Sequence, residues 1–159
     1  MAEPFEHRLE GGEGVLSRVM GARHRAVRAL ESALADAERL TDMTPDQIRE
    51  LCAGYGVDIG DRMRAPCRNL YRRYLEHCLV DCSLSEQESR DLTHLKEILC
   101  IRDADAAQIH DDVAHSVYGA AVQEVLQDYK LDEEEKRFLS ELSAELELSE
   151  SEADRLYQE

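Results

Sequence analysis

The chain has 159 residues, a length that allows one domain with a sizeable hydrophobic core. Its net charge of −16 arises entirely after Arg73, because residues 1–73 carry as many acidic as basic side chains. The acidic half would repel a phosphate backbone, so nucleic acid is not expected as a partner. No apolar run approaches the roughly 20 residues that span a bilayer. The N-terminus lacks the basic and apolar regions of a secretory signal, so the expected location is the cytoplasm.

Every element that the sequence predicts is a helix. Residues 1–13 lack periodicity and are expected to form a flexible tail, whereas residues 14–159 are expected to form a single helical domain. A long helix is predicted over about 14–40. The segment Thr44-Pro45-Asp46-Gln47 predicts the start of a short helix that ends near Gly54. The next helix is predicted over about 59–81, with Pro66 either kinking it or delaying its start.

Three further helices are predicted from capping boxes. Ser85 with Glu88 opens a helix that ends near Leu99, and Asp132 with Glu135 opens the equivalent helix in the last third of the chain. Ser149 with Glu152 opens the last helix, and a long helix is predicted over about 104–128. The expected fold is therefore all-α, with about seven helices in stacked long-helix and short-helix repeats of a solenoid-like bundle.

An internal repeat supports this fold. Residues 69–112 and 116–159 are two ungapped copies of one sequence, with identical pairs such as Leu84/Leu131 and Leu92/Leu139. A fixed period in the range of about 20–50 residues is typical of helical repeats, in which each unit buries its apolar face on a neighbour. A third, degenerate copy is predicted at about 22–65, because Met43 precedes a capping box as Leu84 and Leu131 do.

The loop of each hairpin is acidic and carries candidate metal ligands: Asp81, Glu88, Asp128, Asp132 and Glu135. An EF-hand loop requires glycine at its sixth position and a bidentate glutamate at its twelfth. Here the sixth residues are Glu86 and Glu133 and the twelfth are Leu92 and Leu139, which excludes EF-hand calcium binding. A weaker divalent-cation site is one interpretation. The simpler one is that these carboxylates cap helices.

Other residues of interest are the arginines and cysteines. Arg64, Arg68 and Arg72 are spaced for one helix face, as candidate binding residues for an acidic partner or an anionic membrane surface. The alternative is that acidic C-terminal helices of the same domain neutralise this strip. Five cysteines without an export signal indicate reduced thiols, and Cys78 and Cys82 are expected in the core. No catalytic residue set or cofactor motif is found, so an enzyme is not expected.

Two families share this pattern of helices, acidic loops and capping boxes. Residues 69–159, above all 109–118, 121–125, 131–136 and 148–153, resemble the stromal helical repeats of the large chloroplast inner-envelope translocon subunit. That resemblance implies a scaffold that binds polypeptides or chaperones, although neither membrane helices nor a transit peptide are expected here. The chain is also similar to TerB-like tellurite-resistance and stress proteins. This second resemblance implies metal association through the acidic loops.

The leading functional hypothesis is a non-enzymatic cytoplasmic scaffold for protein–protein interaction, in a translocation, chaperone or stress context and without a cofactor. The alternative is a TerB-like stress protein that binds a divalent cation at the acidic hairpin loops. A third hypothesis is a homodimer that associates through the helix at 14–40.

Overall fold

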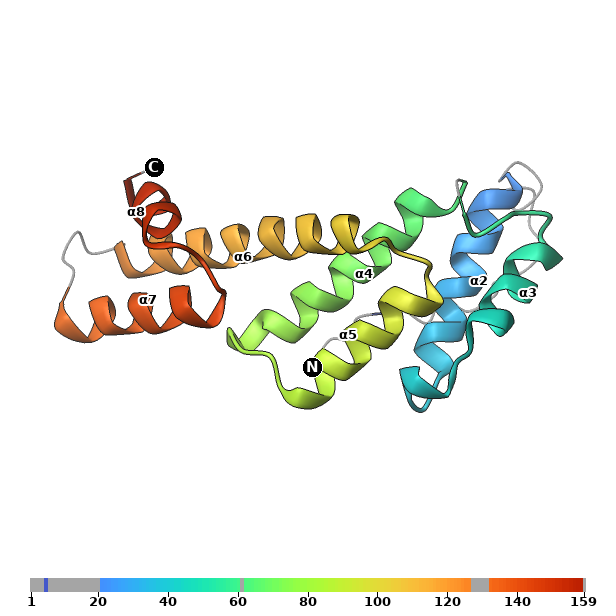
Figure 1. Cartoon of the computed structure of the whole chain (residues 1–159), viewed down its shortest axis with the longest axis horizontal. Helices are drawn as coiled ribbons and strands as arrows, with labels where there is room; N and C mark the ends of the chain where they lie inside the picture. The colour runs from blue at the N-terminus through green and yellow to red at the C-terminus, as the bar shows by residue number, and fades with distance from the viewer. Residues whose placement is uncertain (1–4, 6–20, 61, 127–131, 159) are drawn as a thin grey trace.

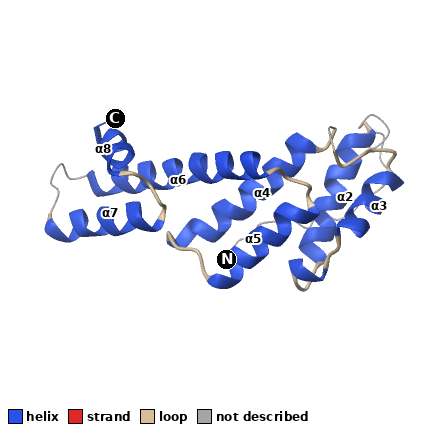
Figure 2. Ribbon diagram, in the orientation of Figure 1, coloured by secondary structure: helices blue, strands red, loops and turns tan. Residues whose placement is uncertain are grey.

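The described part of the chain is all-helical. The structure is a computed structural model, and it describes residues 5, 21–60, 62–126 and 132–158. These residues form seven α-helices and no strand (Figure 2), which confirms the predicted fold class. The helices are α2 (Ala22–Asp36), α3 (Pro45–Gly54), α4 (Arg64–Cys78), α5 (Glu86–Ile98), α6 (Asp103–Val125), α7 (Glu133–Glu145) and α8 (Glu150–Gln158), with short 3₁₀ turns η1 (Leu40–Asp42) and η2 (Leu79–Asp81).

The helices form an elongated array (Figure 1). Helices α2 and α3 lie at one end, α4 and α5 lie in the middle, and α6 runs from the middle to α7 and α8 at the other end. Helix α4 packs on α5 and α6, and α6 in turn packs on α7 and α8. Each helical hairpin therefore covers the apolar face of its neighbour, as expected for stacked repeats.

The predicted capping boxes are present at the starts of α3, α5 and α7. The side chains of Thr44, Ser85 and Asp132 each accept a hydrogen bond from the backbone N–H three residues later. The side chains of Gln47, Glu88 and Glu135 accept the N–H of the capping residue in return, at 2.7–2.8 Å. These caps satisfy backbone donors that the first helical turn leaves without partners, which is why local sequence located the three starts.

The repeat is also visible where the short helices end. Helices α5 and α7 each have 13 residues, and each is followed by a left-handed residue, Cys100 with φ 52° and Glu147 with φ 56°. The next N–H groups, those of Ile101 and Leu148, both donate to the carbonyl five residues earlier at 2.9 Å. Helix α3 has 10 residues and ends in the same turn, with Gly56 at φ 69°. The three short helices thus share one start and one end.

The observed bounds of three predicted helices differ from the expected ones. The helix expected over 14–40 ends at Asp36, and its first residues lie outside the described part of the chain. Leu40 is still buried, but η1 carries it into the core after an extended residue at Ala37. The helix expected over 59–81 begins at Arg64 and ends at Cys78. Of the two effects expected of Pro66, a kink or a delayed start, the delayed start is observed, because proline is tolerated in the first turn of a helix. The helix expected over 104–128 is observed over 103–125, and positions 127 and 128 lie outside the described part of the chain.

The core is aliphatic, as the composition requires. The repeated leucines at 92/139, 95/142 and 99/146 are all buried, and the largest fully buried side chains include Leu30, Ile48, Met63 and Ile109. Among the described residues, no helix is long and apolar enough to cross a bilayer.

Candidate functional site

The predicted arginine strip lies on the face of α4 that packs against α6. Arg64 reaches Asp105 with Nε and Nη2 at 2.9–3.2 Å, and Arg68 Nη1 reaches the same carboxylate at 3.1 Å. Arg102, at the start of α6, adds a contact from Nε at 2.8 Å. The Asp105 side chain is only 10% exposed. We call Asp105 and these three arginines the Asp105 clamp.

The Asp105 clamp joins α4 of one repeat to α6 of the next through ion pairs. One carboxylate faces three guanidinium groups whose side chains are 35–63% exposed, so the clamp keeps an excess of positive charge at the surface. One turn further along α4, Arg72 pairs with Asp112 of α6 at 2.5 Å. The predicted neutralising acids are thus on α6. A role of the strip in binding a partner stays a prediction.

The second copy has a contact at the equivalent positions. Adding the 47-residue offset to Arg68 and Asp105 gives His115 and Glu152, and His115 Nε2 lies 3.8 Å from Glu152 Oε1. The pair joins α6 to α8 as Arg68 and Asp105 join α4 to α6. Sequence reasoning missed both pairs, because the repeat offset shows which residues are equivalent in the two copies but not which of them are in contact.

A second contact between α4 and α6 is neutral. Tyr71 Oη lies 2.8 Å from His110 Nε2, and the two rings are tilted at 5.8 Å. Burial raises the pKa of Tyr71 to about 12 and lowers the pKa of His110. Both side chains are therefore uncharged at neutral pH, which suits a packing contact between repeats.

The acidic loop residues act as caps wherever the structure describes them. Glu88 accepts from the N–H of Ser85 at 2.8 Å, and Asp132 accepts from the N–H of Glu134 and Glu135 at 2.8–2.9 Å. Among the described residues, no three His, Cys, Asp or Glu side chains are grouped for a metal ion. Asp128 and the side chain of Asp81 lie outside that part of the chain, so the metal site stays a prediction.

The cysteines are all free thiols. Cys52, Cys67 and Cys78 are buried, whereas Cys82 is half-buried and Cys100 is exposed. Burial raises the pKa of both the Cys67 and Cys78 thiols to about 12. These two thiols are consequently protonated at neutral pH and poorly reactive.

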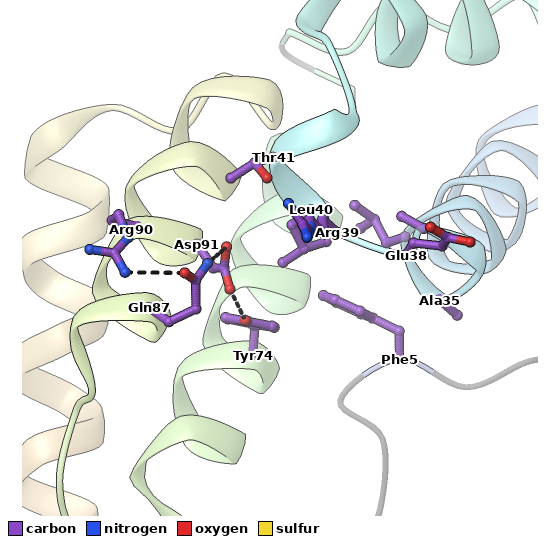
Figure 3. Close-up of a pocket in the computed structure, with 12 residues that line it drawn as sticks. Phe5, Ala35, Glu38, Arg39, Leu40, Thr41, Tyr74, Gln87, Arg90 and Asp91 are labelled. Carbon is purple, nitrogen blue, oxygen red and sulfur yellow. Dashed lines mark hydrogen bonds between the residues drawn. The ribbon is translucent and has the colours of Figure 1, made fainter.

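A groove that the sequence analysis missed opens between the end of α2, η1, α4 and α5 (Figure 3). It has a volume of about 780 Å³ and is lined by apolar Leu34 and Leu40, by Tyr74 and by polar side chains of α5. Tyr74 Oη donates to Asp91 at 3.3 Å, and burial raises the pKa of Tyr74, so this phenol remains a donor. The equivalent of Tyr74 in the second copy is Ala121, so the aromatic wall is specific to the first copy.

One aromatic side chain already occupies this groove. Phe5 lies on Tyr74 with ring centroids 5.7 Å apart and ring planes 14° from parallel, and it is 3% exposed. Phe5 belongs to the segment predicted as a flexible tail, most of which lies outside the described residues. A lone aromatic residue in an aperiodic segment gives no signal that would predict its burial.

Comparison with known proteins identifies the family. No curated protein and no solved structure matches the chain. None of the comparisons supports the resemblance to TerB-like proteins. The family model Tic110, described as a chloroplast envelope transporter, matches residues 17–159. The match extends the resemblance seen over 69–159 to almost the whole chain, which therefore belongs to the Tic110 family.

Proposed function

We propose that this chain is a non-enzymatic cytoplasmic scaffold that binds polypeptides, in the context of protein translocation that its family suggests. The observation that carries the proposal is the open array of three similar hairpins (Figure 1), with a groove at the junction of the first two that buries a side chain from a distant segment. Stacked helical repeats commonly present such extended surfaces to protein partners.

The chemistry of the described residues supports binding more than catalysis. The best-placed polar groups already serve the fold, since Asp105 holds three arginines and the loop carboxylates cap helices.

Binding of an unfolded polypeptide tests the proposal. A fluorescently labelled model protein, held unfolded by reduction and alkylation of its cysteines, is titrated with the full chain while anisotropy is recorded. We expect saturable binding of the unfolded protein and much weaker binding of the same protein with its disulfides intact. No saturable binding of the unfolded protein at high micromolar concentrations would contradict a scaffold for polypeptides.

A further inference from the structure

The groove next to Tyr74 holds a residue that is remote in sequence from its walls. Its walls come from residues 34–41 of α2 and η1, from Tyr74 of α4 and from residues 87–91 of α5. Phe5 enters it from the N-terminal segment and loses almost all of its exposure there. Figure 3 shows the Phe5 side chain pointing into the groove between Leu40 and Tyr74.

The walls of the groove suit an aromatic side chain. Leu34 and Leu40 are buried apolar residues, and the Tyr74 ring provides a flat surface that Phe5 stacks on. Around this slot lie the charged side chains of Glu38, Arg39 and Asp91. An apolar slot with a polar rim is the usual form of a pocket that holds an aromatic anchor residue of a peptide.

The groove also has room beyond the Phe5 ring. Its volume of about 780 Å³ is the space that remains with Phe5 as one of its walls. That volume is in the range of about 300–1,000 Å³ that is typical of ligand sites. The α5 wall of the groove is hydrogen-bonded, since Gln87 Nε2 donates to Asp91 at 3.0 Å and Arg90 donates to Gln87 at 3.2 Å. Peptide backbone lying there would meet amide, guanidinium and carboxylate groups that can pair with it.

We propose that this groove binds an extended peptide segment through an aromatic side chain, and that Phe5 is an internal occupant with which the peptide competes. The inference rests on the proposed function, because it names the site and the chemistry of a bound polypeptide. An occupant carried on the same chain acts at an effective concentration on the order of millimolar. An external peptide must displace it, so removing Phe5 should strengthen peptide binding by about tenfold or more.

The test uses the full chain with Phe5→Ala, and with Phe138→Ala as the matched control, because these are the two phenylalanines of the sequence. The probe is a labelled synthetic peptide of residues 1–10, compared with the same peptide carrying alanine in place of Phe5. We expect the Phe5→Ala chain to bind the probe at least about tenfold more tightly than the unaltered chain. The Phe138→Ala chain should match the unaltered one, and the alanine peptide should bind neither. Circular dichroism checks that the Phe5→Ala chain keeps its helices.

A second variant reports on the groove without removing the aromatic ring. The sequence has no tryptophan, so Phe5→Trp introduces a single fluorescent indole. Its emission should be that of a buried indole and should shift to longer wavelength when the probe peptide displaces it.

Equal affinity of the probe for the Phe5→Ala and unaltered chains would overturn the inference, as would equal binding of the alanine peptide. If the unaltered chain still binds unfolded polypeptide, only the proposed role of the groove is refuted. If the unaltered chain binds neither the probe peptide nor unfolded polypeptide, the proposed function fails as well.

Discussion

Replacing Asp105 by asparagine tests whether the Asp105 clamp holds two repeats together. The substitution keeps the size of the side chain but removes the charge that Arg64, Arg68 and Arg102 share. A buried hydrogen bond to a charged group contributes about 1.5–3 kcal/mol, and an exposed ion pair contributes at most about 1 kcal/mol. Arg64 and Arg68 are 44% and 35% exposed, so their contacts fall between these limits.

Taking about 1 kcal/mol for each of these two contacts and little for the more exposed Arg102, we expect the free energy of unfolding to fall by about 2 kcal/mol. For a chain of this length, that loss corresponds to a decrease in Tm of about 4–8 °C. Urea and thermal unfolding followed by circular dichroism at 222 nm measure both quantities.

The matched control is Asp103→Asn. Asp103 lies in the same helical turn as Asp105 but is 92% exposed, and it pairs with Lys96 at the surface. We expect a clearly smaller loss of stability there, since solvent screens that pair. A double-mutant cycle with Arg68→Met should show coupling, because Arg68→Met removes a contact that Asp105→Asn has already lost. Equal losses for Asp105→Asn and Asp103→Asn, without coupling to Arg68, would refute the reasoning.

Three further measurements follow from the contacts described above. Burial lowers the pKa of His110, so as the pH drops the unfolded chain protonates this histidine before the folded chain does. The free energy of unfolding should therefore fall below about pH 6.5. His110→Asn should reduce that fall, as measured by urea midpoints between about pH 7.5 and 5. Ser85→Ala should cost about 1 kcal/mol of unfolding free energy through loss of its cap, whereas Ser89→Ala at an exposed position of α5 should cost less than about 0.5 kcal/mol in the same assay. Millimolar calcium, magnesium, manganese or zinc should leave Tm unchanged if the loop carboxylates serve as caps; a clear rise in Tm with one of these ions would favour the metal-site alternative.

The starts of the short helices could be predicted because their determinants are local. Thr44, Ser85 and Asp132 each meet their capping partner three residues later, so four residues contain the whole signal. The end of α2 could not be predicted in this way. Leu34 and Leu40 both belong to the core, and sequence spacing alone does not reveal that the chain changes from helix to a 3₁₀ turn between them.

The contacts of the site depend on pairs far apart in the chain. The spacing of Arg64, Arg68 and Arg72 predicted a common helix face, and acidic C-terminal helices of the same domain were one of the predicted partners. Asp105 is the partner of Arg64 and Arg68 because α4 packs on α6. These arginines lie 41 and 37 positions from Asp105 in the sequence, so local spacing does not reveal the contact. The groove depends on Phe5 in the same way, because a single aromatic residue has no periodicity to interpret.

The pair formed by His115 and Glu152 indicates that the polar contact between neighbouring repeats varies in strength along the array. It occupies the positions of Arg68 and Asp105, but its atoms lie 3.8 Å apart and an imidazole replaces a guanidinium that can donate several hydrogen bonds. We therefore expect His115→Arg to strengthen the attachment of α8 to α6 and to slow hydrogen exchange at the backbone amides of α8. Ser116→Arg adds the same charge at a neighbouring exposed position and should leave α8 exchange unchanged. If both variants slowed exchange equally, general attraction to an acidic helix would explain the result, and the pairing of equivalent positions between repeats would carry no stabilising role.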